Sequence, residues 1–386
     1  MNDISKYSSK TTRLVEPSFG SSLTDLIIDL DYLRKKKLGG TTIPQIFFQL
    51  KSLFHTLESI GSARIEGNHT TIAEYIETKF SKEKSPDEKF EEIRNNEKAM
   101  EFIDDTITES HINEAYIREL HKKVVLGLSP SKEGDQNPGE YRTSNVRITK
   151  SSHIPPDYLL VKDYMEEMVS FINKKDSPKY DLLKIALTHH RFVWIHPFTN
   201  GNGRTVRLLT YAQLVKYGFN IHIGHIINPT AIFCNDRNEY YNRLSKADTR
   251  EDKFVLDWCE YVLEGLKKEI EKIDKLLDYS FLSKNILLPA LTDALDRKVI
   301  TPDEEKILKI AVEKQIFQAS DLNKIFIGKL PSHISRLLNR MKKKKMIMSD
   351  KKKGRKYILY FENNFLLRSV IKMLDINGFL PLQGEV

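Results

Sequence analysis

The chain contains 386 residues, of which 40% are hydrophobic and 30% are charged, and its formal net charge is +8. This composition is that of an ordinary soluble protein, and the length suggests two or three domains. No apolar run is as long as a membrane span and the N-terminus lacks the apolar core of a signal peptide, so we expect a cytoplasmic protein with no membrane partner.

Cysteine usage is low. The chain has two cysteines, Cys234 and Cys259, which argues for a reducing compartment and against a structural zinc site. We expect both to be plain core or near-surface residues.

The N-terminal region, residues 1–110, is expected to be helical. Apolar residues recur with helical spacing over residues 22–33 and 44–65. The second helix ends at Gly67, which places Glu66 at the negative end of the helix dipole. A carboxylate is unfavourable there unless a cation compensates it, so we expect a cationic partner elsewhere in the fold. The alternative is a surface glutamate at a helix end.

A change of pattern follows. Thr71 and Glu74 form a capping-box pattern that restarts a helix, and helices resume near residue 112. Residues 129–156 are instead rich in Gly, Pro, Ser and Asn, and the alternating Val146 and Ile148 suggest a short strand with a hairpin partner. An exposed strand edge can bind an extended peptide, although the segment could also be an ordinary surface hairpin.

The stretch from His196 to Arg207 carries the strongest chemical signal. Apolar residues with helical spacing precede and follow it, so we expect a helix, a tight loop and a second helix. Gly201 and Gly203 allow the loop amides to turn inward at a helix N-terminus, where an anion is favoured. Arg204 and Arg207 fall on one helix face and can bind further phosphate oxygens. His196 can accept a proton near neutral pH.

A base beside a polyphosphate cradle indicates phosphoryl or nucleotidyl transfer. The Gly-Lys-Ser/Thr ending of the ordinary nucleotide-hydrolase loop is not found in this sequence. The alternative interpretation is structural, a buried histidine followed by a glycine-rich turn between helices.

The stretch resembles the signature of the Fic family, His-Pro-Phe-x-(Asp/Glu)-Gly-Asn-Gly-Arg-x-x-Arg, at every specified position but one. The resemblance implies an all-α fold, mainly helical with a small β-hairpin flap. It also implies transfer of AMP from ATP to a Ser, Thr or Tyr hydroxyl of a target protein, including the chain itself. His196 would be the general base, and the nucleotide would be bound by Gly201, Asn202, Gly203, Arg204 and Arg207.

The phrase from Ser62 to Gly67 resembles the inhibitory motif of the same family, Ser/Thr-x-x-x-Glu-Gly/Asn. The resemblance implies that Glu66 pairs with Arg207 and keeps this arginine from the γ-phosphate, so that AMP transfer is autoinhibited. In some members this glutamate positions water for removal of AMP from the target.

Two further resemblances concern ligand contacts. The segment with Val146, Ile148 and His153 resembles the flap that holds the target segment. Tyr240 belongs to a pair of tyrosines after the signature helix and resembles a residue that lines the adenine pocket, although core packing is the default for such a pair.

Asn200 is the one departure from the signature, because the family usually has a carboxylate there that holds Mg²⁺. Asparagine offers one neutral carbonyl oxygen, a weaker ligand for a hard cation such as Mg²⁺ or Mn²⁺. Metal binding could be retained with lower affinity or carried by the phosphates. The alternatives are another nucleotide donor or a reaction shifted toward AMP removal.

The C-terminal region differs in charge. Residues 301–386 contain eighteen Lys and Arg against nine Asp and Glu, so the positive charge is local to this region. We expect helices over 302–314, 319–325 and 332–345 and strands over 346–348 and 357–361 flanking a lysine-rich turn. This order resembles a winged helix-turn-helix, with a candidate recognition helix that carries Ser332, His333, Ser335, Arg336 and Arg340.

Four regions follow: an N-terminal helical region 1–110, a catalytic core 111–270, a linker helix 271–298 and a winged helix-turn-helix domain 299–386. The last would bind DNA through its basic helix and wing, or would mediate homodimerisation or target recruitment. A rival to the enzyme interpretation is a DNA-binding regulator whose Fic-like core is only a scaffold.

Overall fold

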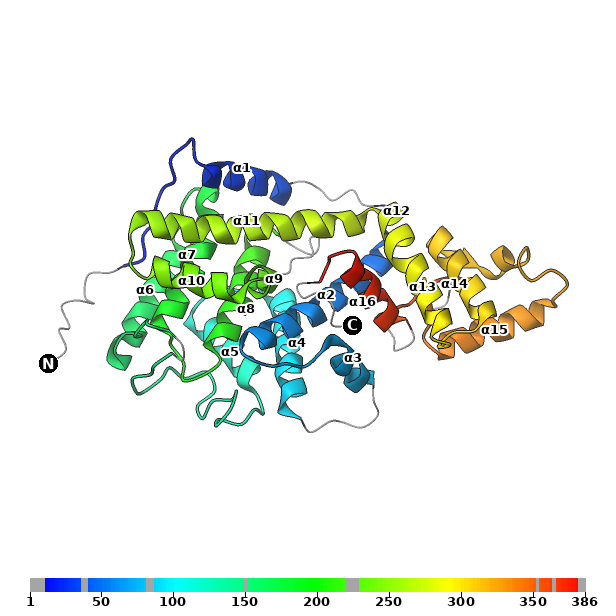
Figure 1. The fold of residues 1–386 in the computed structure, drawn as a ribbon, viewed down its shortest axis with the longest axis horizontal. Helices are drawn as coiled ribbons and strands as arrows, with labels where there is room; N and C mark the ends of the chain where they lie inside the picture. Colours follow the sequence, from blue (N-terminus) through cyan, green and yellow to red (C-terminus); the bar gives the residue numbers. More distant parts are fainter. Residues whose placement is uncertain are drawn as a thin grey trace. The chain divides into compact units, whose positions relative to one another are not determined.

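The computed structural model describes residues 11–35, 41–80, 87–148, 151–219, 229–351, 354–362 and 366–380. Within these ranges the chain is mainly helical, as predicted (Figure 1). It divides into two compact units, one of Met1–Lys37, Glu58–His69 and Pro86–Ile270, the other of Leu38–Leu57, Thr70–Ser85 and Glu271–Val386. The expected N-terminal region therefore contributes to both units. No helix in the described ranges is long and apolar enough to cross a membrane.

The first unit is a helical bundle around one central helix. Its helices are α1 (Ser22–Lys35), the end of α2 (Pro44–Ile65), α4 (Glu88–Thr106), α5 (Glu114–Val125), α6 (Val161–Asn173), α7 (Asp181–Ile195), α8 (Asn202–Lys216), α9 (Pro229–Cys234), α10 (Arg237–Ala247) and most of α11 (Asp252–Leu277). Helix α8 packs against α4, α5 and α7, and its apolar side chains, among them Val206, Leu209 and Ala212, are buried. A helix that is buried on every side is a core helix, and its two ends are therefore fixed in place.

Helices α7 and α8 form the predicted helix, loop and helix. Helix α7 ends at Ile195 because His196 has a left-handed backbone (φ 51°) and Pro197 cannot continue a helix. Helix α8 begins after Gly201, whose φ of 69° suits glycine. The indole of Trp258 donates a hydrogen bond of 2.7 Å to the carbonyl of Ala186 and ties α11 to α7.

The expected strand at Val146 and Ile148 is absent from the structure. Across residues 129–148 and 151–156 the backbone forms no strand. Side chains hold this segment instead: Asn145 accepts a hydrogen bond of 2.9 Å from the Tyr158 amide, and Arg142 donates to the carbonyls of Ser144 and Pro156. The predicted strand is therefore wrong for the described residues, where side-chain contacts and not backbone pairing are observed.

The second unit begins with the first part of α2 and with α3 (Ile72–Phe80), whose capping box is present as predicted, with Glu74 accepting from the Thr71 amide at 2.8 Å. Its remaining elements are α12 (Tyr279–Phe281), a π-helical segment (Leu282–Leu287), α13 (Leu288–Asp296), α14 (Pro302–Lys314), a 3₁₀ turn (Ala319–Leu322), α15 (Pro331–Lys343) and α16 (Leu367–Ile376).

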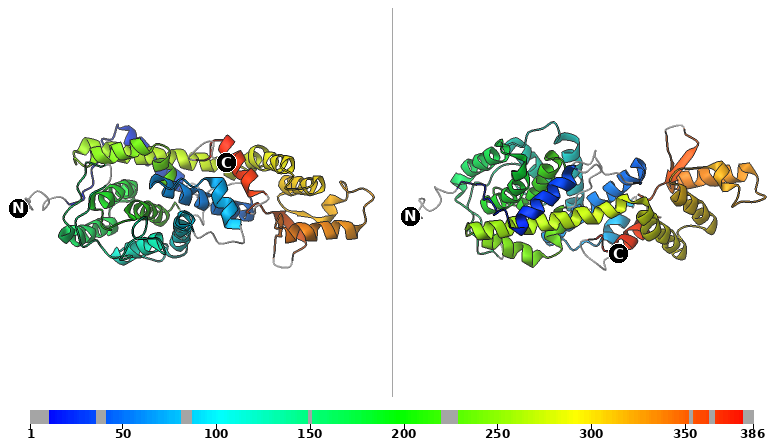
Figure 2. Two further views of the ribbon diagram at one scale, coloured as in Figure 1. Left: turned by 60° about the horizontal axis from the view of Figure 1, so that its bottom comes forward. Right: turned by 90° about the horizontal axis from the view of Figure 1, so that it is seen from above.

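A small antiparallel sheet accompanies α15. Its strands are β1 (Phe317–Gln318), β2 (Ile347–Ser349) and β3 (Lys356–Leu359), in the order β1-β3-β2. Figure 2 shows the orange strands beside α15. The predicted helix over 302–314 has the predicted bounds, and Thr301 and Glu304 form a capping box at its start. The lysine-rich turn lies partly outside the described residues.

Candidate functional site

The backbone of His196 is fixed by an arginine that the sequence analysis did not single out. The Nε of Arg142 donates to the His196 carbonyl at 2.9 Å, and its Nη2 donates to the Ile195 carbonyl at 3.4 Å. The Arg142 amide donates to the Pro197 carbonyl at 2.9 Å. Carbonyl groups at the C-terminal end of a helix have no donor within the helix. Arg142 donates to those at the end of α7 and thereby orients His196.

The His196 imidazole is suited to accept a proton. Its Nδ1 is buried and has no hydrogen-bond partner in the described part of the chain. Desolvation and, to a smaller extent, the Arg142 guanidinium lower the pKa of His196 to about 4. The ring is therefore neutral at physiological pH and can act as a base.

The loop between α7 and α8 is closed by its own asparagine. The Asn202 side chain accepts a hydrogen bond from the Phe198 amide at 3.0 Å and donates to the Phe198 carbonyl at 2.8 Å. The carboxamide is thus used within the loop, and only the Asn202 backbone is left for a ligand. Gly201 is the N-cap of α8, and no side chain forms a capping hydrogen bond with the first turn. Uncapped amides at a helix N-terminus favour an anion.

A carboxylate of the chain itself lies at this helix end. A Cβ built on Gly203 would stand 2.1 Å from Oε1 of Glu66, so the Glu66 carboxylate lies directly against the first turn of α8. Burial by itself raises the pKa of Glu66, but the guanidiniums of Arg207 and Arg204 outweigh burial and hold this pKa below its ordinary value. Glu66 is ionised, and it occupies the position that favours an anion.

Arg207 binds both the carboxylate and the helix that carries it. Its Nη2 donates to Oε1 of Glu66 at 2.6 Å and to the carbonyl of Ser62 at 2.9 Å, and its Nε donates to Oγ of Ser62 at 2.9 Å. The Arg207 side chain is 1% exposed and the Glu66 side chain 27%. The expected cationic partner of Glu66 is therefore Arg207. Gly67 ends α2 with a φ of 107°, which favours glycine.

Arg204 is held by two carboxylates that the sequence analysis did not single out. Its Nη1 lies 3.1 Å from Oε1 of Glu92, and its Nη2 lies 2.9 Å from Oε2 of Glu133. The Arg204 side chain is completely buried, so it does not contact solvent. The other oxygen of Glu92 accepts a hydrogen bond of 2.7 Å from Asn68, which follows the Ser62–Gly67 phrase. Both arginines of the signature are therefore neutralised by carboxylates of the same chain.

Asn200 lies in a network of hydrogen bonds. Its Nδ2 donates to the Lys132 carbonyl at 2.5 Å, and its Oδ1 accepts from the Gly201 amide at 2.8 Å. His121 accepts from the Gly139 amide through Nδ1 at 2.9 Å, so its Nε2 carries the proton that it donates to the Asn200 carbonyl at 3.1 Å. The His121 ring stacks on Phe198 with the ring centroids 3.8 Å apart, and this contact supports the loop between α7 and α8.

The chain offers little to a metal ion. In the ranges that the structure covers, no group of three or more His, Cys, Asp or Glu side chains could hold one. Asn200 contributes one neutral carbonyl oxygen, which already accepts a hydrogen bond. These residues do not form a metal site without further ligands such as phosphate oxygens.

The three residues expected at a flap are differently placed. Val146 and Ile148 are partly exposed on the segment that lacks a strand. The His153 Nε2 donates to the Trp194 carbonyl at 2.8 Å, and its ring packs against the Trp194 indole. His153 is therefore fastened to α7 and does not extend toward solvent as a flap contact would.

Tyr240 is not placed as a nucleobase contact. It is 2% exposed, and its hydroxyl shares a hydrogen bond of 2.9 Å with Nε2 of His189. Its ring packs against Phe233 at a centroid distance of 4.9 Å. The neighbouring Tyr241 is 43% exposed, with the Arg237 guanidinium 5.5 Å above its ring. Core packing, the default for the pair, thus applies to Tyr240, and Tyr241 is the accessible ring.

Comparison with known proteins places part of this chain in a family. Residues 111–214 match the profile of the Fic/DOC family. The chain is 30% identical over 220 residues to "Protein adenylyltransferase Fic" of Aedes aegypti, covering 54% of this chain and 40% of that protein. It is 30% identical over 250 residues to the protein of the same name from Nematostella vectensis, covering 61% and 52% respectively. The chain thus spans about half the length of these curated relatives.

Solved structures share the fold. A Fic family protein from Desulfovibrio desulfuricans G20 superposes with a TM-score of 0.54 at 17% identity, over 91% of this chain and 98% of that one. A Fic domain-containing signalling protein from Bacteroides thetaiotaomicron superposes with a TM-score of 0.53 at 21% identity, over 67% and 97%. The segment from residue 111 to residue 214, which contains His196 and the loop that leads into α8, is therefore a domain of the Fic/DOC family.

Proposed function

We propose that this chain is a protein adenylyltransferase that transfers AMP from ATP to a Ser, Thr or Tyr hydroxyl of a target protein. The observation that carries the proposal is the neutral His196, half-buried with its Nδ1 buried, beside an uncapped helix N-terminus with two buried arginines. The curated relatives that bear this name support it.

The reaction assigns one role to each group. The target hydroxyl oxygen attacks the α-phosphorus of ATP, and its proton passes to His196. The new oxygen–phosphorus bond replaces the bond to the bridging oxygen, and pyrophosphate leaves. The α8 amides and the guanidiniums of Arg204 and Arg207 stabilise the negative charge on the phosphates. A Mg²⁺ or Mn²⁺ ion brought with the triphosphate would be held by Asn200 and the phosphates, and it would neutralise phosphate charge.

Glu66 is proposed to inhibit this reaction. Its carboxylate contacts Gly203 and Arg207, the groups that a phosphate would use. Because two anions cannot occupy one helix end, ATP binds productively only when Glu66 moves away. Ser62 holds Arg207 in the same arrangement and supports the inhibition.

Substrate contacts are proposed on both sides of this site. Tyr241 replaces Tyr240 as the proposed adenine contact, because its ring is exposed and both tyrosines act electrostatically on Arg207. The segment around Val146 and Ile148 remains the proposed docking place for the target, and the chain itself is one candidate target.

The test compares three forms of the full chain with ATP labelled on the α-phosphate and with Mg²⁺: the native protein, Glu66→Gly, and Glu66→Gly with His196→Ala. Covalent label only in the Glu66→Gly form supports the transfer, the base and the inhibition together. Equal labelling of the form without His196 would sink the assignment of the base.

Asn200 favours a second candidate reaction at the same site, AMP removal or the use of another nucleotide donor. Its neutral oxygen gives weaker metal binding than the carboxylate of the signature. Unlabelled nucleotides that compete with labelled ATP, together with a Mg²⁺ and Mn²⁺ titration, separate the candidates. If unlabelled GTP or CTP competed as strongly as unlabelled ATP, the assignment of ATP as the donor would be wrong.

For the second unit we propose a winged helix that binds DNA. Helix α15 exposes Ser332, Ser335 and Arg336, and it lies beside the β2–β3 ribbon. DNA binding that weakens steeply with salt and is lost in Arg336→Ala would support the proposal. A homodimer in solution without DNA binding would favour a role in dimerisation or target recruitment.

A further inference from the structure

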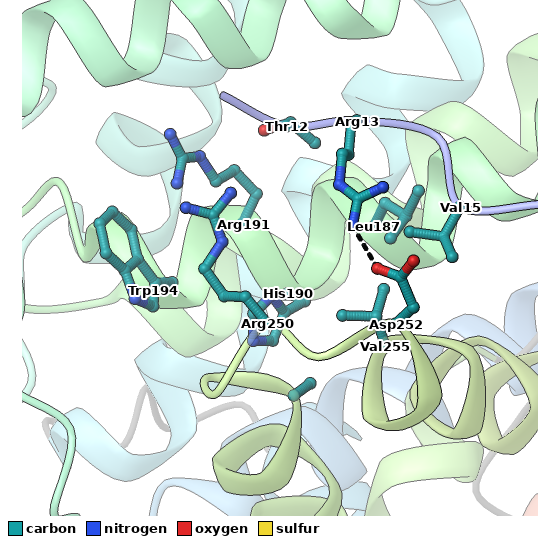
Figure 3. A pocket seen from close by; sticks show the side chains of 11 residues that line it. Thr12, Arg13, Val15, Leu187, His190, Arg191, Trp194, Arg250, Asp252 and Val255 are labelled. Atoms are coloured by element: carbon teal, nitrogen blue, oxygen red, sulfur yellow. Dashed lines mark hydrogen bonds and ion pairs between the residues drawn. The ribbon is translucent and has the colours of Figure 1, made fainter. Parts of the chain in front are cut away.

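A pocket in the first unit is lined by three arginines that the proposed reaction does not use. Arg191, Leu187 and Trp194 reach it from α7, Arg13 comes from the N-terminal segment, and Arg250 comes from the turn before α11 (Figure 3). The enclosed part of the pocket measures about 50 Å³, and the pocket opens to the solvent.

The three guanidiniums of this pocket differ in how their positive charge is balanced by carboxylates. Arg13 forms an ion pair with Asp252, and Arg191 lies 3.0 Å from Oε2 of Glu167. Arg250 forms no ion pair with the described residues, donates to the Thr11 carbonyl at 2.9 Å, and leaves its buried Nη1 without a hydrogen-bond partner there. Arg250 therefore has no direct carboxylate partner in the described part of the chain, although the Glu167 carboxylate acts on it electrostatically.

The charge of Arg250 lies beside another of the same sign. Figure 3 shows the Arg191 and Arg250 guanidiniums side by side, with Trp194 next to them. Burial lowers the pKa of Arg250, and the neighbouring Arg191 lowers the pKa further. The Glu167 carboxylate, which pairs with Arg191, acts less strongly on Arg250 than Arg191 does. A further anion between the two partly desolvated cations would therefore be favourable.

The backbone at Arg250 adds an independent observation. Its φ is 62°, in the left-handed region that favours glycine or asparagine. For a residue other than glycine this backbone conformation costs free energy, and it fixes the direction in which the side chain leaves the backbone. The strained turn directs the Arg250 guanidinium toward Arg191.

We propose that this pocket binds a small oxyanion that carries a phosphate group, with Arg250 as the principal ligand and Arg191 and Arg13 as secondary ligands. A phosphate is a dianion with several acceptor oxygens, so it can pair with more than one guanidinium, whereas a carboxylate carries a single charge. Leu187 and Trp194 line the same pocket, so the carbon skeleton of a phosphomonoester would meet apolar side chains there.

The test titrates the full chain with inorganic phosphate, glycerol 3-phosphate and acetate at low ionic strength, by calorimetry. We expect a phosphate Kd of about 1 mM or below and much weaker acetate binding. Tighter binding of glycerol 3-phosphate than of inorganic phosphate would identify a phosphomonoester as the ligand, and the reverse would identify free phosphate. Acetate binding as tightly as phosphate would overturn the phosphate class.

Three variants locate the binding. Arg250→Gln should weaken it by about tenfold or more, and the matched surface variant Arg94→Gln should leave it unchanged. Asp252→Asn frees Arg13 from its carboxylate and should strengthen binding by about threefold, a gain that a purely structural role of the cluster does not produce. Native affinity in Arg250→Gln, or no gain in Asp252→Asn, would overturn the proposal. The readout is binding alone, so it does not depend on AMP transfer.

Discussion

Oε1 of Glu66 lies 2.6 Å from Nη2 of Arg207, at the end of a helix whose first turn has no side-chain cap. The glutamate comes from the end of α2 and the arginine from α8, 141 residues later in the chain. The pair neutralises a charge that a nucleotide would otherwise meet. The proposed inhibition of AMP transfer depends on how easily this ion pair breaks.

Ser62→Ala should release Arg207 in part. The change removes the hydroxyl that accepts from Nε of Arg207, while the Ser62 carbonyl and Glu66 remain. We expect a loss of about 1 kcal/mol in the free energy of unfolding and an increase in AMP labelling smaller than that of Glu66→Gly. Ser59→Ala on the same helix is the control, and an equal increase in labelling there would argue against a specific role for Ser62.

Glu133→Gln should improve nucleotide binding. Arg204 is held by Glu133 at 2.9 Å, and a phosphate must displace this carboxylate. Because the Glu133 side chain is 40% exposed, its pair with Arg204 is only weakly stabilising, and we expect ATP to bind about threefold more tightly. Equilibrium titration of ATP in the Glu66→Gly background measures this. Glu140→Gln, which removes an exposed partner of Arg118, should have no effect.

Arg142→Met should destabilise the fold and reduce transfer. The carbonyls of Pro156, Ile195 and His196 would lose their donor, and unpaired buried carbonyls cost about 3 kcal/mol together. Urea unfolding measures the loss, and Arg94→Met should stay within about 0.5 kcal/mol of the native chain. If Arg142→Met unfolds, Arg142→Lys gives the test, with weaker labelling in a folded chain as the expected result.

The pH profile of transfer should lack a histidine step near pH 6.5. Burial lowers the pKa of His196 to about 4, so the base stays neutral until the pH approaches that value. The labelling rate of Glu66→Gly at saturating ATP should therefore fall only in acid. An acid limb with its midpoint near 6.5 would contradict the lowered pKa of His196.

The same shift has a consequence for stability. The native state favours neutral His196, whereas the unfolded state binds a proton at the ordinary pKa of 6.5. The contribution of His196 to stability is therefore complete above pH 6.5 and is lost as the pH falls from 6.5 to about 4. His196→Gln lacks this contribution, so its stability should fall less than that of the native chain over the same range.

Local patterns in the sequence were enough to predict several features. The bounds of α2 and α14 follow from apolar spacing and terminal residues, and the structure has both as predicted. The loop after His196 follows from Pro197 and Gly201, whose backbone restrictions are intrinsic to the residue. The unfavourable place of Glu66 at a helix end correctly indicated a cationic partner. These features depend on neighbours within one or two helical turns.

Tertiary structure decided the rest, because contacts between residues far apart in the chain leave no local pattern. The sequence around Glu92 and Glu133 does not indicate that both carboxylates reach Arg204. The sequence around Arg142 does not indicate that its side chain donates to the carbonyls at the end of α7. The absence of the expected strand at 146–148 and the burial of Tyr240 beside an exposed Tyr241 have the same cause. Burial and partner choice depend on which surfaces the folded helices bring together, and only the packed structure determines them.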